Sequence, residues 1–312
     1  MTRLVDVAAK AGVSKSTVSN VIRGTALVAE ETRRKVERAI ADTGYRPNAI
    51  ARALQAKSGN AVGIIVPDLT NPFYAQLAIG VERTAAAMGF AVLTAHTECA
   101  AESEIAAAHA FIERRVGGAV IGGMSLNSPL PKLLLDHDIP VTLAALGEIE
   151  DARPGVVEQD EAAAMEEVVE HLHALGHRRI AFVAHDLIEH AGERRRVGFL
   201  QAMRRRDLLP AAEKDATALV AHDDMRAIAA IDRLERAGRR VPHDISITGY
   251  DDVPLAAHGR IQLTTIRADA VEMGHRAATL ITEATRQGRH VGRRVVMPST
   301  LIVRASTAAP PA

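Results

Sequence analysis

Five polar residues in one short segment carry side chains that could recognise a nucleic acid. The segment covers residues 15–22, and the five residues on its outward side are Lys15, Ser16, Thr17, Ser19 and Asn20. Their hydroxyl and amide groups can exchange hydrogen bonds with base edges, and a lysine ammonium can contact phosphate. The pattern therefore predicts recognition through hydrogen bonds and charge, without a covalent step.

Two helices are needed to present these side chains. Gly12 is typical of a helix end, and Ser14 stands where it can cap a second helix that begins at Lys15. The apolar residues that would pack the two helices together are Val7, Ala8, Ala11, Val18, Val21 and Ile22. This spacing is that of a helix-turn-helix that reads a DNA groove, although an ordinary surface helical hairpin has the same pattern.

The charge distribution favours DNA contact by the first part of the chain only. Residues 1–60 hold 11 Lys+Arg and 5 Asp+Glu, whereas residues 61–312 hold 27 and 33. A third helix at 30–42 would add an outward row of cations, which are Arg33, Arg34, Lys35 and Arg38. A basic head on an acidic body brings phosphate to the head and keeps it from the body.

From residue 61 the pattern becomes strands alternating with helices, which predicts parallel sheets covered by helices. Expected strands are 61–67, 90–95, 119–121, 140–143, 180–183, 218–221 and 245–248, and expected helices are 72–88, 102–114, 162–175, 193–206 and 225–237. The rhythm restarts after a break, so two α/β lobes are expected. Ligands of such sheets bind beyond the carboxyl ends of the strands, which predicts a cleft between the lobes.

The chain resembles the lac repressor and purine repressor (LacI/GalR) family of bacterial transcription regulators. The stretches that carry the resemblance, in the family's order, are DVAAKAGVSKSTVSNVI (6–22), VAEETRRKVERAIADTGYRPNAIARAL (28–54), VGIIVPDLTNPFYAQL (62–77), ALGHRRIAFV (174–183), RRVGF (195–199), RVPHDISITGYDD (240–252) and LTTI (263–266). The implied fold is an all-α helix-turn-helix head with a hinge helix, followed by a periplasmic-binding-protein-like effector domain of two doubly wound lobes.

The resemblance implies a repressor that binds double-stranded, pseudo-palindromic operator DNA as a homodimer. Lys15, Ser16 and Asn20 match the family's positions for base recognition, and the residues expected to hold the DNA backbone are Thr17, Ser19 and Asn48. Leu54 matches the hinge leucine that wedges between base pairs in the minor groove. The alternative for Leu54 is a residue packed on its own head or lobe.

A small-molecule effector, such as a sugar or a related polar metabolite, is implied for the cleft. The matching positions are Phe73, Asp160, Arg195, Asp223 and Asp251. The alternative for the charged ones is that they cap structural elements or pair across the lobes. Three departures make a plain hexose or pentose less secure: Ala145-Leu146 stands where sugar-binding members carry Asp-Arg, and Glu161 and His222 each replace an Asn.

The expected organisation is a DNA-binding domain at 1–46, a hinge helix and linker at 47–60, and an effector and dimerisation domain at 61–312. Within the last, one lobe would comprise about 61–160 and 268–293, and the other about 161–267 and 294–305. Helix 270–286, with Ala277, Leu280 and Ile281 on one face, and part of the helix after Pro72 are expected to form the dimer surface.

Other classes of protein fit the sequence less well. No Gly-x-Ser-x-Gly, phosphate loop or Gly-x-Gly-x-x-Gly is present, so we expect no enzyme; a nuclease or invertase would also need a catalytic cluster in the body. A periplasmic binding protein would carry an export signal and no basic head. With Cys99 alone and no apolar run near 18 residues, we expect a cytoplasmic protein without disulfide, metal or cofactor.

Overall fold

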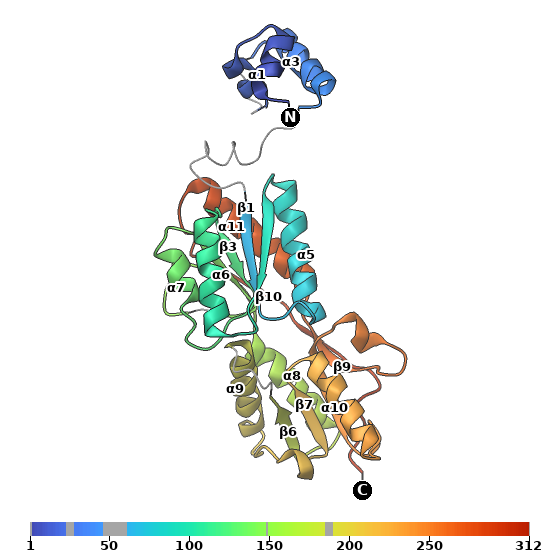
Figure 1. The fold of residues 1–312 in the computed structure, drawn as a ribbon. Coiled ribbons are helices and arrows are strands. Elements are labelled where there is room, and N and C mark those ends of the chain that lie inside the picture. Colours follow the sequence, from blue (N-terminus) through green and yellow to red (C-terminus); the bar gives the residue numbers. More distant parts are fainter. Residues whose placement is uncertain (1, 23–27, 46–60, 148, 185–189, 312) are drawn as a thin grey trace. The chain divides into compact units, whose positions relative to one another are not determined.

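The computed structural model describes residues 2–22, 28–45, 61–147, 149–184 and 190–311 (Figure 1). The chain divides into two compact units, residues 1–57 and 58–312. The predicted hinge helix and linker at 47–60, with Asn48 and Leu54, lie outside the described residues. None of the helices in the described ranges combines the length and apolar character that crossing a bilayer requires.

Where the structure describes the first unit, in residues 2–22 and 28–45, three helices form a bundle: α1 (Leu4–Ala11), α2 (Lys15–Ile22) and α3 (Glu30–Thr43). Gly12 ends α1 with a φ of 66°, in the left-handed region that glycine adopts without strain. The bundle has its own small core, whose buried members are Val7, Ala8, Val18, Val21, Val36 and Ala39. The apolar spacing that predicted the two packed helices is thus confirmed.

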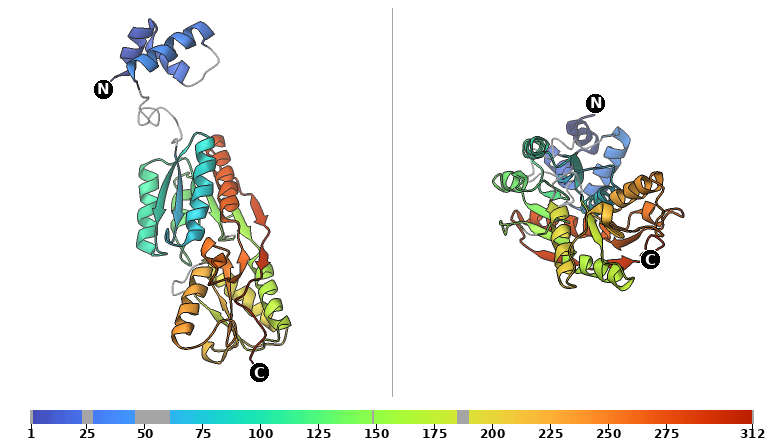
Figure 2. Two further views of the ribbon diagram at one scale, coloured as in Figure 1. Left: turned by 90° about the vertical axis from the view of Figure 1, so that its right-hand side faces the viewer. Right: turned by 90° about the horizontal axis from the view of Figure 1, so that it is seen from below.

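The second unit begins with a six-stranded parallel sheet. Its strands, in the order in which they pair, are β10 (Arg294–Met297), β5 (Gly155–Gln159), β4 (Val141–Ala144), β3 (Ala119–Ile121), β1 (Ala61–Val66) and β2 (Ala91–His96). Helices α5 (Pro72–Ala87) and α11 (Ala270–Gln287) cover one face, and α6 (Ala101–Glu113) and α7 (Leu130–Leu135) cover the other (Figures 1 and 2).

The second lobe holds a five-stranded sheet. The pairing order is β11 (Thr300–Ile302), β9 (Thr264–Arg267), β8 (Ser246–Asp251), β7 (Ala218–Ala221) and β6 (Ile180–Val183), and only the β11–β9 pair is antiparallel. The helices of this lobe are α8 (Glu161–Ala174), α9 (His190–Arg204) and α10 (Asp224–Arg236), with short 3₁₀ turns at Glu213–Asp215 and Pro254–Ala257. The predicted pair of doubly wound lobes is therefore confirmed.

The chain passes between the two lobes where β5 leads to α8, where β9 leads to α11 and where β10 leads to β11. The sequence-based boundary placed 294–305 in the second lobe, whereas β10 pairs with β5 in the first sheet. The third passage thus falls after Met297. Strands β5, β9, β10 and β11 are short and lie outside the strand–helix alternation, which is why that pattern did not reveal them.

The apolar face of helix α11 that the sequence suggested for the dimer surface lies inside its own lobe. Ala277, Leu280 and Ile281 are at most 1% exposed, because they pack inside their own lobe. A side chain added at Gly118 would meet Ile281, and one added at Gly155 would meet Leu280, so both side chains lie directly on the sheet. The apolar face of α11 is thus a core face, so Ala277, Leu280 and Ile281 do not form the expected dimer contact, and the rest of the expected dimer surface stays a prediction.

Helices α5 and α11 approach each other closely through a pair of glycines. A Cβ added at Gly80 would lie 2.1 Å from the carbonyl oxygen of Val271, and one added at Gly274 would lie 2.2 Å from the carbonyl oxygen of Leu77. Both clashes are with backbone, which cannot move aside as a side chain could. The two helices can therefore pack at this distance only with glycine at both positions.

Replacing Gly80 by alanine tests this packing. Alanine favours an isolated helix over glycine by about 1 kcal/mol. We nevertheless expect Gly80→Ala to lower the free energy of unfolding by about 1–3 kcal/mol, because the added methyl overpacks the crossing. Urea unfolding followed by far-ultraviolet circular dichroism measures the difference. Gly259→Ala is the control, since nothing lies within 4 Å of its added Cβ; equal stabilities of the two variants would contradict the argument.

Candidate functional site

The start of α2 is capped by a serine and carries no acidic residue in its first turn. The Ser14 hydroxyl accepts a hydrogen bond from the Thr17 backbone N–H (3.1 Å), which caps the helix as predicted. Its oxygen also lies 2.7 Å from the Ser16 hydroxyl and 2.8 Å from the Thr17 hydroxyl. The first turn contains no acidic residue, so nothing there repels an anion from the positive end of the helix dipole.

The predicted contact residues of α2 differ in exposure. Lys15 and Ser16 are exposed, whereas Thr17, Ser19 and Asn20 are half-buried. Lys15 and Ser16 can thus extend furthest from the bundle, and the other three lie closer to its surface. Asn48 and Leu54 belong to residues that the structure does not describe.

Three of the four cations of α3, Arg33, Arg34 and Lys35, pair with acids of the same helix. Arg34 pairs with Glu30 at 3.3 Å, and Lys35 pairs with Glu31 at 2.8 Å. The hydrogen bond from Lys35 lowers the pKa of the Glu31 carboxyl, so the pair is ionic at neutral pH. These cations lie beside a groove of about 420 Å³ between α1 and α3. The outward row that the sequence predicted is present, but neighbouring carboxylates offset part of its charge.

In the second lobe, Arg195 and Asp251 meet at the carboxyl end of β8. The Arg195 guanidinium carbon lies 3.7 Å from the ring centroid of Tyr250, and Nη2 lies 3.4 Å from Asp251 Oδ1. Nη1 donates a hydrogen bond of 2.9 Å to the carbonyl oxygen of His222. Both charged residues are 5% exposed. The structure thus brings together two of the predicted effector residues and holds them in a fixed orientation.

The aromatic ring beneath this pair links the two lobes. Burial raises the pKa of the Tyr250 hydroxyl, which therefore stays protonated and donates to Gln159 Oε1 at 3.3 Å. Tyr250 belongs to the second sheet and Gln159 to the first. The predicted cleft residues therefore lie beside a direct polar contact between the lobes.

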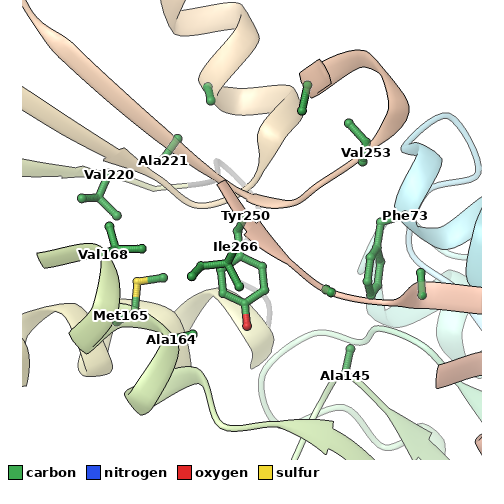
Figure 3. Close-up of a cluster of buried hydrophobic side chains, with 14 of the residues drawn as sticks. Phe73, Ala145, Ala164, Met165, Val168, Val220, Ala221, Tyr250, Val253 and Ile266 are labelled. Carbon is green, nitrogen blue, oxygen red and sulfur yellow. The ribbon is translucent and has the colours of Figure 1, made fainter. Parts of the chain in front are cut away.

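Phe73 lies in the first turn of α5 and is 3% exposed. Asn71 caps the helix by accepting from the Phe73 N–H at 3.0 Å, and Pro72 stands at the first helical position. Figure 3 shows Phe73 and Ala145 from the first lobe in one buried apolar cluster with Tyr250 and Val253 from the second. The apolar core thus continues across the boundary between the lobes, close to the Arg195–Asp251 pair.

Asp160 and Asp223 both serve as helix caps. Asp160 accepts from the Ala163 N–H at the start of α8 (2.9 Å), and Asp223 accepts from the Arg226 N–H at the start of α10 (2.7 Å). Asp160 is exposed, whereas Asp223 is 5% exposed. Each carboxylate thus has the structural role that was the alternative to effector binding, and its contact with an effector stays a prediction.

The sequence did not point to Tyr250, Asp224 or Gln159 as parts of this site. Each stands beside a residue that the sequence did single out, namely Asp251, Asp223 and Asp160. These three residues could have been found by considering the chain neighbours of each predicted site residue that lies on a strand or at a helix start. His222 was noted only as a departure, and its backbone carbonyl, which any residue type supplies, holds Arg195.

Asp224 fixes the backbone that carries Asp251. It is fully buried and accepts hydrogen bonds from the Val253 N–H (2.8 Å) and the Thr265 hydroxyl (2.6 Å). Asp251 and Asp252, which directly precede Val253, have φ values of 107° and 53°, which non-glycine residues rarely adopt. Burial raises the pKa of Asp224 to about 7 in spite of the two hydrogen bonds.

The raised pKa predicts a pH-dependent stability. Because the native pKa of Asp224 is about 7 and its ordinary value is 3.8, its favourable contribution is complete below about pH 4 and is lost as the pH rises through 7. Compared with Asp224→Asn, the wild type should lose a few kcal/mol of unfolding free energy between pH 4 and pH 8, since one pKa unit is about 1.4 kcal/mol. Urea unfolding at stepped pH measures this.

A surface carboxyl provides the control for that series. Arg240 lowers the pKa of Asp244 to about 2, so Asp244→Asn should show no pH-dependent difference from the wild type between pH 5 and pH 8. Parallel stability profiles of the wild type and Asp224→Asn across pH 4–8 would contradict a titration of Asp224 in this range.

Comparison with known proteins agrees with this arrangement of the chain. The family model of bacterial regulatory proteins of the lacI family matches residues 3–48, and the periplasmic binding protein and sugar-binding domain of the same family matches residues 59–215. The HTH-type transcriptional regulator DegA of Bacillus subtilis (strain 168) is 31% identical over 98% of both chains. The chain belongs to the LacI family. A model of periplasmic-binding-protein-like domains also covers residues 169–307.

Solved structures of the LacI family share the fold over the whole chain. The lac repressor dimer bound to operator and the anti-inducer ONPF has a TM-score of 0.86 at 26% identity, covering 99% of both chains. A complex of the transcriptional regulator CelR with cellobiose has a TM-score of 0.72 at 26% identity, covering 98% of this chain and 100% of that one. The protein is thus a DNA-binding transcriptional repressor, not an enzyme, and an effector bound between its two lobes controls it.

Proposed function

We propose that the protein binds a pseudo-palindromic operator as a homodimer and that a small polar effector, such as a sugar, changes its affinity for that operator. The observation that carries this is the buried Arg195–Asp251 pair over Tyr250, beside the contact between the lobes. It offers an oriented hydrogen-bond donor and acceptor for ligand hydroxyls next to the Tyr250–Gln159 contact, which a movement of the lobes would change. As a regulator of transcription, the protein would act at the nucleoid in the cytoplasm.

The head contributes sequence recognition through α2. Lys15 and Ser16 are exposed in its first turn, and Asn20 follows one helical turn after Ser16. Residues four apart share a helix face, so Ser16 and Asn20 can contact neighbouring base pairs in one major groove. Thr17 and Ser19 lie to either side of this face and would hold the DNA backbone. Net charge at the head adds the nonspecific part of the affinity.

Exchanging single side chains of α2 separates these roles. Ser16→Ala and Asn20→Ala should each relax the preference for one base pair of the half-site, at a cost of about 1–3 kcal/mol. Selection of binding sites from randomised duplex DNA, followed by binding titrations, measures the preference. Ser19→Ala is a matched control, because loss of a backbone contact should weaken all sequences alike. If Ser16→Ala and Asn20→Ala also weakened all sites equally, both residues would be reassigned to phosphate contact.

The hinge and the domain limits remain proposals that rest on the resemblance. In this proposal residues 1–46 form the DNA-binding domain, and a hinge helix within 47–60 pairs with that of the second protomer at the operator centre. Asn48 would then hold the DNA backbone, while Leu54 would wedge between base pairs of the minor groove. With the inner face of α11 buried in its own lobe, the outward side of α5, where Ile79 is 43% exposed, is the surface proposed for the dimer.

The effector would lie between Phe73 and the Arg195–Asp251 pair. A sugar has apolar C–H faces that can stack on an aromatic ring and hydroxyls that can bind a guanidinium and a carboxylate. The related regulator CelR forms a complex with cellobiose, which supports a sugar here. Ala145 and Glu161 in place of the usual polar residues make a ligand other than a simple hexose or pentose the better fit. Asp160 and Asp223 would complete the set.

A thermal-shift screen against monosaccharides and disaccharides, including cellobiose, tests the site. A sugar present at 100 times its dissociation constant should stabilise the effector domain by about 2.7 kcal/mol. Arg195→Lys keeps the charge but loses the planar fork, so it should lose most of the shift that any active sugar produces. Arg196→Lys is the matched control, because Arg196 is exposed and pairs with Glu193 on its own helix. An unchanged sugar titration for Arg195→Lys would rule the assignment out.

A further inference from the structure

Two buried carboxylates stand on either side of the first passage between the lobes. Glu158 lies on β5 of the first sheet and is 1% exposed, and Glu161 is the first residue of α8 and is 3% exposed. Gln159 and Asp160 between them carry the chain from one lobe to the other. The separation of these two carboxylates therefore depends on the angle between the lobes.

Arg194 contacts both carboxylates at once. Its Nη1 donates to Glu158 Oε2 at 2.6 Å, and its Nη2 lies 2.8 Å from Glu161 Oε2. Arg194 itself belongs to α9 of the second lobe. One rigid, planar guanidinium thus bridges the passage, with one nitrogen on each side of it.

The first lobe is shaped to receive this guanidinium. Gly147, which follows β4, has a φ of 75°, and a Cβ added there would lie 1.4 Å from Arg194 Nη1. A side chain at position 147 would thus occupy the place of the guanidinium. Glu158 is also paired with Arg294 on the neighbouring strand β10, so its charge stays compensated within its own lobe.

The contact on the second-lobe side is the weaker half. Glu161 Oε2 is buried and close to Nη2, but it receives no hydrogen bond of good geometry. Burial raises the pKa of Glu161, and Arg194 and Arg195 oppose that rise. Arg194 and Glu161 both belong to the second lobe, so a change of the lobe angle acts on the Arg194–Glu158 contact, while Glu158 keeps Arg294.

We propose that Arg194 is a positioning residue that fixes the angle between the two lobes by bridging Glu158 and Glu161 across the passage at 159–160. It adjoins Arg195 on α9, so an effector that draws on Arg195 displaces the helix that carries both arginines. The action of an effector on the bridge rests on the proposed effector site, whereas the bridge itself is present in the free protein. An arginine is required, because lysine cannot reach two carboxylates with a planar fork.

Electron–electron distance measurements between spin labels test the bridge without DNA or effector. Labels go on Glu113→Cys of α6 and Glu235→Cys of α10, both exposed, in a Cys99→Ser background. The full chain with Arg194, mixed with excess unlabelled protein so that a dimer carries one labelled protomer, should give one narrow distance. Arg194→Met should lose that single distance and give a broad or shifted distribution, and Arg194→Lys should restore it only in part. Gly147→Asn, which tolerates the positive φ, should act like Arg194→Met by displacing the guanidinium.

Matched controls separate the bridge from general damage. Arg196→Met, close by on the exposed side of α9, should leave the distance distribution unchanged. If Arg194→Met does not fold by circular dichroism, Glu161→Gln removes the second-lobe charge that orients Arg194 toward Glu158, and it should broaden the distribution. A folded Arg194→Met or Glu161→Gln with the distribution of the parent protein would overturn the proposal. Because no ligand is used, that result would leave the proposed operator and effector binding untouched.

Discussion

A charged guanidinium buried in the effector domain constrains the residues around it, because they must compensate its charge. Arg195 is nearly inaccessible to water, so its charge must be met by protein groups, and the face of Tyr250, the Asp251 carboxylate and the His222 carbonyl meet it from separate segments. Removing a partner from such a cluster costs about 3–5 kcal/mol, because an uncompensated charge is left buried. The ends of β7 and β8 and the helix α9 are thereby held together.

The same constraint explains the unusual backbone next to that cluster. Asp251 and Asp252 adopt positive φ angles that cost of order 1–3 kcal/mol each, and such strain persists only where the surroundings impose it. Here the surroundings are Asp224, which accepts a hydrogen bond from the Val253 N–H, and Arg267 and Arg304, which pair with Asp252. An effector that replaces one of these partners would therefore act on a backbone that is already strained, so a small ligand could shift its conformation.

The sequence predicts those parts of the molecule whose pattern is local. Helix spacing and the Ser14 cap are set by residues close in sequence, and the structure has them where expected. The inward face of α11 was misread because an apolar stripe does not reveal whether it meets a partner protomer or its own sheet. The partners of Glu158 and Tyr250 come from distant segments, and neither periodicity nor spacing encodes which of them meet.

The three passages of the chain between the lobes determine how the effector domain can move. They lead from β5, β9 and β10 to the other lobe, so three covalent strands cross one boundary. Three chain connections across one boundary resist sliding and separation of the lobes, but they allow the lobes to bend about the line that joins the connections. A ligand held between the lobes would then act mainly on the angle between them, and this one rotation would carry the effect of binding to the rest of the protein.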